Sequence, residues 1–435
     1  MYNAYITTLK DIRKHTNADR LQCVEVFDQN VVIGLEYKEG QRVVFFPVDG
    51  QLSLEFAKEN NLVRKKDFAG NNIGGYMDEK KRNIAAIKLR GERSEGLILP
   101  IECLEKYTDI SELKDGDAVS KFGDIEICRK YIPRGPRGRV RGSGGGKART
   151  WNESGKKYLY FDEHIHTDQL AYNMSAFYPG DTIYLTRKLH GTSGRTMKTM
   201  EEKKENTWIR KELGLPEQTV QAPAVISGSR KRVLHYINDG TAERSDEKLR
   251  EKYHNLLKDI IPMGFEIFYE IVGYLEDGTP IMGHISNSKV KDREFGEKFG
   301  RESVFSYGCE EGQSEMYVYR MTVTTQDGIK IELPWESVKY WCGKMGLKHV
   351  PELEKFIFTT EEDLKARVHK YNEGMPFDEI GQKHIAEGVV VRIDNRNKFT
   401  AFKDKVFEFK VLEGIIKENA EAPDMEEAEE IEDVV

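Results

Sequence analysis

A basic, glycine-rich segment divides this chain of 435 residues into two parts. Between residues 129 and 149 the sequence has eight Lys or Arg, no acid, and the run RGSGGGK. Such a segment cannot bury enough apolar surface to fold by itself. We therefore expect a linker over residues 129–150. The composition fits both a solvated tether and a basic strap along nucleic-acid phosphates.

The part before the linker reads as a series of short strands. Over residues 1–128, runs such as QCVEVF, VVIGLEY, RVVFFPV and GLILP are separated by Gly, Asn and Asp. Strand-length runs with this punctuation predict a small β-barrel or sandwich.

The part after the linker, residues 151–417, mixes strands and helices. Strands are expected at DTIYLTRKL, APAVISGS, GFEIFYEIVGY, MYVYRMTV, EGVVVRI and KVFEFKVLEG. PWESVKYWCGKMG and TTEEDLKARVHKYNEG read as helices, the second with Thr359 and Glu362 in capping-box spacing. The pattern predicts an α+β domain.

Composition narrows the class of protein. Residues 418–435 contain nine acids and no base. Because the net charge of the whole chain is −7, the rest of the chain has a net charge of about +2. The repulsion between the acids of residues 418–435 predicts a disordered tail. Five scattered cysteines without a CxxC pair favour a reducing compartment and no zinc knuckle. Apolar runs fall far short of the roughly 18 residues that span a bilayer. We expect a cytoplasmic protein without a membrane partner.

Single charges interrupt several of the apolar runs. Lys188 ends one run and is followed by HGTSG, Glu270 lies within FYEIVG, and Glu387 precedes GVVVR. Lys403 and Lys405 alternate along one strand and so share a face. Taken singly, each residue also has a simpler explanation. Lys188 and the HGTSG that follows fit an ordinary hairpin, and each glutamate fits a buried acid with a cation partner. The lysine pair fits an edge strand on which lysines improve solubility.

Taken in order, the five charges resemble the motifs of the covalent nucleotidyltransferases, which include ATP-dependent ligases and mRNA capping enzymes. KLHGTS matches the nucleophile motif KxDG except at its third position, and SGSRKR, FYEIVG, MYVYRM, EGVVVR and FKDKVFEFK resemble the motifs that follow. The resemblance covers about residues 180–412. In the first part, KHTNADRL, FFPVDG and IKLRG are similar to the OB-type module of the fifth RNA ligase family.

The resemblance implies a two-domain α+β protein. An amino-terminal OB-like β-barrel, residues 1–128, would bind nucleic acid and be followed by an ATP-grasp-like nucleotidyltransferase domain of antiparallel sheets and helices. Such barrels hold strands on a basic, aromatic face. The candidate basic residues, which scattered surface charge would explain equally well, are Arg13, Lys14, Arg20, Lys88, Arg90 and Arg93.

The resemblance also implies a catalytic set. Lys188 would attack the α-phosphate of ATP and carry AMP, which requires a neutral amine although free lysine titrates near 10.4. Lys403, Lys405 and a divalent cation would lower its pKa and stabilise charge on the phosphates. Glu387 would hold Mg²⁺ or Mn²⁺, and Glu270 would bind the ribose or help at the metal.

Five further residues would contact the nucleotide. Tyr319 would stack on adenine, Arg195 and Arg230 would meet ribose or phosphate, and His190 and Gly191 belong to the nucleophile motif. His190 stands where Asp is usual, and a neutral imidazole there would make activity depend on pH near its ordinary ~6.5.

The predicted function is an ATP-dependent RNA ligase that joins 3′-OH and 5′-phosphate ends, in a nicked duplex and in RNA repair; the sequence predicts no protein partner. Only about thirty residues follow the last motif, too few for the carboxy-terminal OB domain of DNA ligases and capping enzymes. A DNA ligase and a GTP-using capping enzyme are the alternatives that share the lysine chemistry. A non-catalytic OB protein that binds RNA or tRNA would explain residues 1–128 alone.

Overall fold

The computed structural model is a mixed α+β protein built mostly of sheets. It describes residues 2–418 except 67, 69, 71, 133–159, 162–163, 165–166, 206–207, 215–217, 231–232, 235–236, 238–239, 284, 287–292, 374–377, 382–383 and 395. Most of the expected linker and almost all of the acidic tail lie outside the described residues. None of the helices in the described part has the length and apolar character that a bilayer crossing requires.

The N-terminal part, residues 2–132, consists of small antiparallel sheets. β12, β5, β1 and β13 form one sheet, β2, β3 and β4 a second, and β16, β6 and β9 a third. Two apolar cores lie between them, centred on Val44 and Phe46 and on Val43 and Phe45. Successive residues of β5 thus supply both cores, because side chains of a strand alternate between its faces. The elements are β1 Ala4–Thr8, β2 Arg13–Lys14, β3 Leu21–Val26, β4 Gln29–Gly34, β5 Arg42–Phe46, β6 Gly50–Leu52, α1 Leu54–Glu59, β7 Lys65–Lys66, β8 Asn72–Gly74, β9 Asn83–Ile84, β10 Ala86–Leu89, β11 Glu92–Glu95, β12 Leu97–Pro100, β13 Ala118–Val119, β14 Lys121–Phe122, β15 Ile125–Glu126 and β16 Cys128–Lys130.

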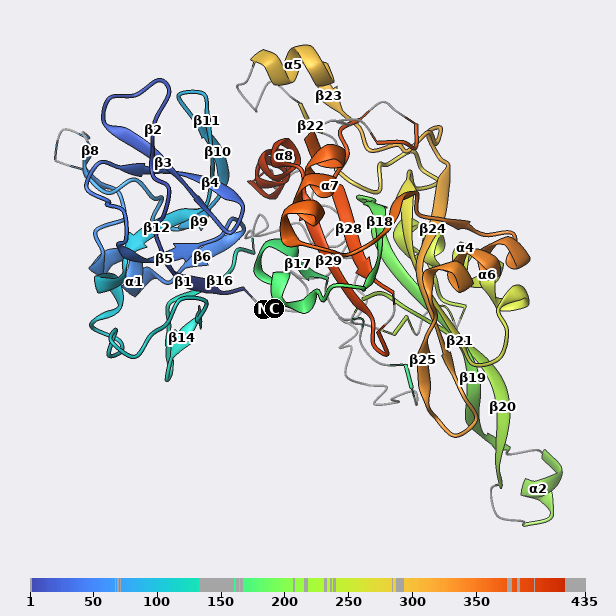
Figure 1. Cartoon of the computed structure of the whole chain (residues 1–435). Helices are drawn as coiled ribbons and strands as arrows, with labels where there is room; N and C mark the ends of the chain where they lie inside the picture. Colours follow the sequence, from blue (N-terminus) through green and yellow to red (C-terminus); the bar gives the residue numbers. More distant parts are fainter. Residues whose placement is uncertain are drawn as a thin grey trace.

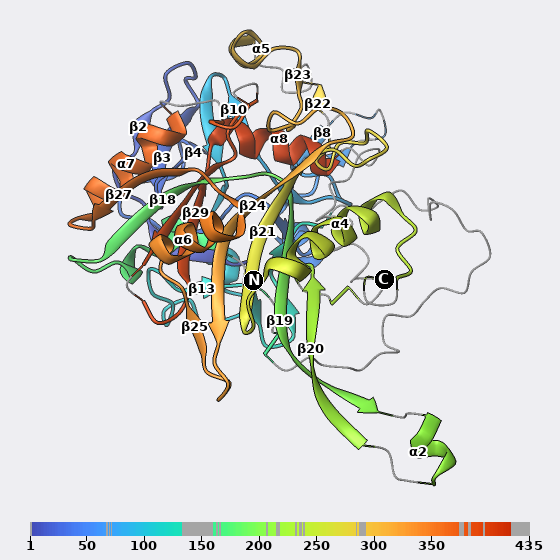
Figure 2. The ribbon, with the colours of Figure 1, turned by 90° about the vertical axis from the view of Figure 1, so that its right-hand side faces the viewer.

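The C-terminal part, residues 160–418, contains two large sheets. The first has the order β17-β29-β28-β18-β27; the second runs β20-β19-β21-β24-β25, with β26 pairing β24. Its strands are β17 Asp168–Gln169, β18 Thr182–Lys188, β19 Thr192–Glu205, β20 Gln218–Gly228, β21 Phe265–Gly273, β22 Ile285–Ser286, β23 Glu302–Ser303, β24 Ser314–Thr324, β25 Lys330–Glu332, β26 Lys348–His349, β27 Glu352–Ile357, β28 Gly388–Ile393 and β29 Thr400–Lys405. The hairpin of β19 and β20 extends away from the rest of the protein (Figure 2).

The helices of this part are α2 Trp208–Glu212, α4 Ser245–Ile260, α5 Arg293–Phe299, α6 Trp335–Met345, α7 Glu361–Glu373 and α8 Phe407–Glu418. Leu364, Val368 and Tyr371 of α7 pack on the first sheet, while α4 and α6 contribute to the larger core against β21 and β24. The two expected helices are confirmed, although the hydroxyl of Thr360, not Thr359, caps α7 by accepting from the Asp363 amide at 3.2 Å.

One expected strand was wrong. The run KVFEFKVLEG is not a strand, because β29 ends at Lys405 and α8 begins at Phe407. Apolar and charged residues alternate over Phe407–Val411, but Phe409 and Leu412, three residues apart, are the fully buried pair. That spacing belongs to one face of a helix.

Helices of the C-terminal part meet strands of the N-terminal part. α8 lies against β10 and β11, and α7 lies beside α8 (Figure 1). Ion pairs join Arg93 of β11 to Glu373 of α7 and Glu408 of α8. The strand β29, which directly precedes α8, is therefore placed close to the contact between the two parts.

Candidate active site

Three motif residues meet at one end of the first sheet. The strand register places Lys188, the last residue of β18, opposite Gly388 of β28, and Gly388 opposite Lys405, the last residue of β29. Lys403 lies two residues before Lys405 and so points to the same face. Because α7 packs on the opposite face, the three lysines converge on the side left uncovered by that helix.

Glu387 joins two of these lysines. Its Oε1 lies 2.8 Å from the Nζ of Lys188 and 3.2 Å from the Nζ of Lys405. Burial alone would raise the pKa of the Glu387 carboxyl, but the ammonium groups of Lys188 and Lys405 outweigh burial and bring the pKa below its usual value. Its second oxygen, Oε2, is buried and has no hydrogen-bond partner among the described residues.

The lysine pair has two different environments. Lys405 also forms an ion pair with Glu413 of α8, at 2.7 Å. Burial, followed by the charges of Lys405 and Lys188, lowers the pKa of Lys403 to about 7. Lys405 is therefore paired with two carboxylates, those of Glu387 and Glu413, while Lys403 titrates near neutral pH and a bound anion would stabilise its charged form.

Gly388 allows the close approach of β28 and β29. A Cβ atom at this position would lie 2.1 Å from the carbonyl oxygen of Asp404 and 2.8 Å from the Cα of Lys405, and the residue has a φ of +154°. Any larger residue would push the lysine strand away from Lys188.

We expect Gly388→Ala to lower the free energy of unfolding by about 3 kcal/mol, because the added methyl group clashes with backbone. Denaturant unfolding measures the change. Gly343→Ala is the control: it adds a methyl group within α6, where nothing lies within 4 Å, and should stabilise by about 0.5–1 kcal/mol. Equal stability of the two variants would contradict the steric role of Gly388.

The loop after Lys188 carries the chain from the first sheet to the second. A Cβ on Gly191 would lie 2.3 Å from the carbonyl oxygen of Ile271 and 3.0 Å from the Cγ of Glu270, so glycine is needed there. Ser193 then pairs with Glu270 in the second sheet. This crossing brings Glu270 of β21 close to the nucleophile motif.

The structure corrects the expected titration of His190. Burial lowers its pKa to about 4, so the ring is neutral between pH 5.5 and 8 and gives no pH dependence near 6.5. Its ring packs edge-on against Phe305 and Phe409, and its Nε2 is buried without a hydrogen-bond partner among the described residues. The backbone amide of His190 donates to the hydroxyl of Tyr307 at 2.6 Å, which fixes the loop.

Three other expected residues, Tyr319, Arg195 and Arg230, contact His164 or Phe161. The His164 amide donates to the carbonyl of Arg230 at 2.9 Å, and its ring lies 5.7 Å from that of Tyr319. Arg195 is buried; its guanidinium lies over the ring of Phe161 and pairs with Glu266 at 3.3 Å. Their assignments to adenine, ribose or phosphate stay predictions.

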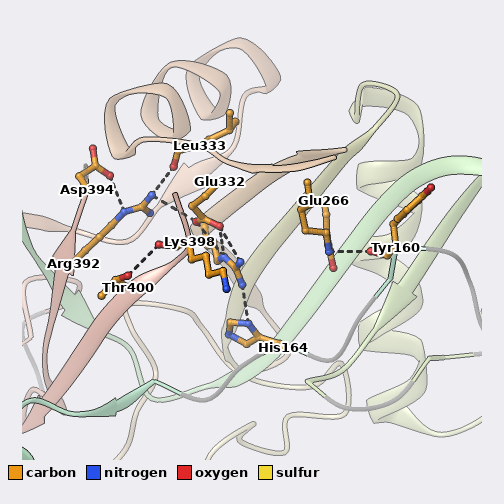
Figure 3. Close-up of polar contacts among 11 residues, drawn as sticks. Tyr160, His164, Glu266, Glu332, Leu333, Arg392, Asp394, Lys398 and Thr400 are labelled. Atoms are coloured by element: carbon orange, nitrogen blue, oxygen red, sulfur yellow. Dashed lines mark hydrogen bonds and ion pairs between the residues drawn. The ribbon is translucent and has the colours of Figure 1, made fainter. Parts of the chain in front are cut away.

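A buried ion network lies beside this group. Arg320, which follows Tyr319, pairs with Glu332 at 2.8 Å and reaches the Nδ1 of His164 at 3.3 Å. Arg392 joins Glu332 to Asp394, and Figure 3 shows these contacts. The basic residue after Tyr319 therefore holds β24 to β25 and to the His164 segment.

The cluster suits a divalent ion that is bound by few protein atoms. No group of three or more His, Cys, Asp or Glu side chains is arranged as a metal cage in the described part of the chain. Glu387 offers one buried oxygen that lacks a hydrogen-bond partner there, and Glu270 lies close to the same loop. Mg²⁺ commonly takes one or two carboxylates and keeps its remaining ligands as water or substrate phosphate.

Two of the six basic residues expected to bind RNA form ion pairs within the protein. Arg13 pairs with Glu92 at 2.8 Å, and Arg93 pairs with Glu408 at 2.8 Å, so both have structural roles. The remaining four are exposed: Lys14, Arg20, Lys88 and Arg90.

Sequence reasoning missed Glu413, Tyr307 and His164. Glu413 lies eight residues after Lys405, and reading KVFEFKVLEG as a helix would have indicated that an acid could fold back on the lysine pair. Nothing local marks Tyr307 or His164, which reach the site from distant segments.

The site combines a strand-end lysine, a carboxylate that pairs with it and two further lysines on the same sheet face. These are features of a nucleotidyltransferase. The chain belongs to the RNA ligase family: the family model described as RNA ligase matches residues 181–412, more than half of the chain. No curated protein matches the chain.

Solved structures of Naegleria gruberi RNA ligase share the fold. A lysine-to-alanine mutant with ATP and Mn is 16% identical over 94% of this chain and 98% of that chain, with a TM-score of 0.55. A lysine-to-methionine mutant with AMP and Mn is 16% identical over 94% and 97%, with a TM-score of 0.53. At this identity the likeness concerns the fold alone.

Proposed function

We propose that this RNA ligase uses ATP to form a covalent lysyl-AMP at Lys188 and then joins RNA ends that carry a 3′-OH and a 5′-phosphate. The observation that carries the proposal is the contact of Lys188 and Lys405 with the same Glu387 oxygen, at 2.8 and 3.2 Å. The ATP, AMP and Mn in the Naegleria gruberi structures of the same fold support the nucleotide and the metal.

The residues of the cluster have different roles in the first step. The Nζ of Lys188, once neutral, forms an N–P bond with the α-phosphate of ATP while the bond to pyrophosphate breaks. Lys403 and Lys405 face the same space and stabilise negative charge on the phosphoryl oxygens. Glu387 holds the lysine amines in place until the nucleotide arrives.

A divalent ion, Mg²⁺ or Mn²⁺, would be held by Glu387, with Glu270 near the ribose or at the metal, and would supply positive charge at the phosphates. Tyr319 would contact the adenine, and Arg195 and Arg230 the ribose or phosphate.

The second and third steps move AMP to RNA and release it. The 5′-phosphate of RNA attacks the phosphorus on Lys188, which frees the lysine and leaves AMP joined to the RNA end. The 3′-OH then attacks that end, a phosphodiester bond forms, and AMP leaves. A nicked duplex holds the two ends side by side, which converts the last step into a reaction between neighbours.

Four segments of the chain have separate roles in the proposed function. Residues 1–128 would be an OB-like module that binds RNA, residues 129–150 a basic linker, residues 151–417 an ATP-grasp-like catalytic domain, and residues 418–435 an acidic tail. Exposed Lys14, Arg20, Lys88 and Arg90 support RNA binding by the first. The free cysteines support an intracellular place of action, and we propose RNA repair as the role.

Mass spectrometry after incubation with ATP and Mn²⁺ tests the proposal. We expect a gain of roughly 329 Da, one AMP less water, on the peptide that contains Lys188. GTP in place of ATP tests a capping activity, and nicked duplexes with RNA or DNA on each side of the break test a DNA ligase. A protein that binds RNA but gains no nucleotide would be a binding module and not a ligase of this mechanism.

The low pKa of Lys403 predicts proton uptake when ATP binds. At pH 8 the free enzyme has mostly neutral Lys403, since its pKa is about 7. Phosphate oxygens beside it favour the charged form and raise the pKa. Lys188→Met cannot form the covalent bond, and it keeps the burial and the Lys405 charge, the two largest causes of the low Lys403 pKa. Calorimetry of ATP binding to this variant should therefore show up to about one proton taken up per ATP at pH 8 and almost none at pH 6.

The added change Lys403→Met should remove most of this uptake, whereas Lys339→Met, at a lysine on α6, should leave it unchanged. Uptake that is equal at pH 6 and pH 8, or that survives Lys403→Met, would show that Lys403 does not meet the phosphates.

A further inference from the structure

Charged side chains buried between the two parts of the protein lie directly behind the catalytic lysine strand. Glu95, the last residue of β11, accepts from the Nζ of Lys410 in α8 at 3.0 Å. Both side chains are about nine-tenths buried, with 10% and 11% of their surface exposed. Arg93, two residues earlier in β11, pairs with Glu408 of α8 at 2.8 Å and with Glu373 of α7 at 3.0 Å.

Asp404, the residue between Lys403 and Lys405, faces this contact. Alternation along β29 directs its side chain away from the two lysines and toward α7, where the amide of Asn372 donates to its Oδ2 at 2.5 Å. Lys410 and Glu95 are among the charges that act on the Asp404 carboxyl. The N-terminal part thus supplies two of the charges around the back of the lysine strand, those of Glu95 and Asp28.

Helix α8 connects this contact to the catalytic face. Lys410 reaches Glu95, while Glu413, one turn later on the same helix, pairs with Lys405 at 2.7 Å. The helix begins two residues after Lys405, so a shift of α8 also shifts the end of β29. Glu95 therefore acts on Lys405 through two ion pairs and one turn of helix.

We propose that Glu95 of the N-terminal part is a positioning residue for the adenylylation of Lys188, because it holds α8 and the Lys403/Lys405 strand in register with Lys188. The N-terminal part then serves the first chemical step, which needs no RNA, in addition to binding RNA. This inference rests on the proposed function.

The Glu95→Gln substitution removes one charge from a buried ion pair. Glu95→Gln keeps the shape of the side chain but leaves the ammonium of Lys410 facing a neutral amide. A buried charge without its partner is unfavourable, so Lys410 must move toward Asp404 or toward solvent, and α8 moves with it. A displacement of about 1 Å at a reacting group can reduce a rate up to about 100-fold.

Single-turnover adenylylation of the full-length protein, measured with labelled ATP and Mn²⁺ in the absence of RNA, tests the proposal. We expect Glu95→Gln to lower the maximal rate per active site by about tenfold, while the half-saturating ATP concentration changes less than about twofold. Active-site titration counts the folded enzyme, so loss of folded protein does not enter the rate. Glu95→Asp, which keeps the charge, should recover part of the rate.

Glu92→Gln is the matched control. Glu92 begins the same strand, and its partner Arg13 lies within the N-terminal part. The adenylylation rate of the Glu92→Gln variant should stay within about twofold of the rate of the unmodified enzyme. A Glu95→Gln rate within twofold of the unmodified enzyme, or an equal loss in Glu92→Gln, would overturn the proposal. If Glu95→Gln does not fold, Lys410→Gln, which breaks the same ion pair from the side of α8, is compared with Glu92→Gln by the same criterion.

The two proposals fail in different ways. An unmodified enzyme that gains no AMP refutes the lysyl-AMP mechanism itself. An unmodified enzyme that gains AMP at a rate unaffected by Glu95→Gln leaves the mechanism intact and confines the N-terminal part to RNA binding.

Discussion

Replacement of Lys188 by methionine is expected to abolish covalent AMP on the protein and to reduce RNA sealing with ATP on the order of 10³-fold or more. Methionine has a similar length but no amine, so no N–P bond can form. The two other lysines of the cluster cannot take over this role, since Lys405 is held by Glu387 and Glu413 and Lys403 lies on β29, which β28 separates from the Lys188 strand β18. Labelled AMP retained after denaturation measures the first effect, and gel analysis of nicked RNA the second.

The same variant should still seal RNA whose 5′ end already carries AMP, because that substrate no longer needs the lysine. Lys339→Met is the control: its side chain is 26% exposed, against 25% for Lys188, and it is paired with Glu352 at 2.7 Å. It should adenylylate within about twofold of the unmodified enzyme. Full AMP incorporation by Lys188→Met would show that another residue is the nucleophile.

The sequence could predict the members of the lysine cluster because each stands on a strand with its own local pattern. Lys188, Glu387 and the pair Lys403 and Lys405 adjoin apolar β-type runs, and hydrogen-bond register then brings the strand ends together. Strand existence follows from local composition, so these residues could be named before the sheet order was known.

Local patterns failed where the decisive contacts come from distant residues. The run after Lys405 alternates like a strand, yet packing of Phe409 and Leu412 into the larger core makes it a helix. The ordinary pKa expected for His190 assumed contact with water, but Phe305 and Phe409 bury the ring. Tertiary burial decided both outcomes, and no spacing within the sequence encodes it.

The loss of charge at Glu387 is the second large effect that we expect. Glu387→Gln should slow adenylylation by about 100-fold or more and lower the free energy of unfolding by about 3–5 kcal/mol at pH 7. The carboxylate is 2% exposed and contacts two ammonium groups through one oxygen. In the variant, Lys188 and Lys405 lose this carboxylate, while Glu413 still pairs with Lys405. The metal concentration needed for half-maximal activity should also rise, because Oε2 is replaced by an NH₂ group that cannot bind a cation.

The stability effect has a defined pH window. The folded-state pKa of Glu387 lies below its usual value, so its stabilising contribution is complete above the unfolded pKa, about 4.3, and is lost as the pH falls through the folded value. The difference between the two proteins in urea unfolding should therefore be largest near pH 7 and shrink below pH 4.

Glu352→Gln is the matched control for this substitution, since Glu352 also pairs with a lysine but is 26% exposed. It should cost about 1 kcal/mol or less and leave adenylylation within about twofold. If both variants lost equal stability and both kept their adenylylation rate, Glu387 would be an ordinary ion-pair partner. The convergence of Lys188 and Lys405 on its oxygen would then reflect packing of the sheet and not preparation for phosphoryl transfer.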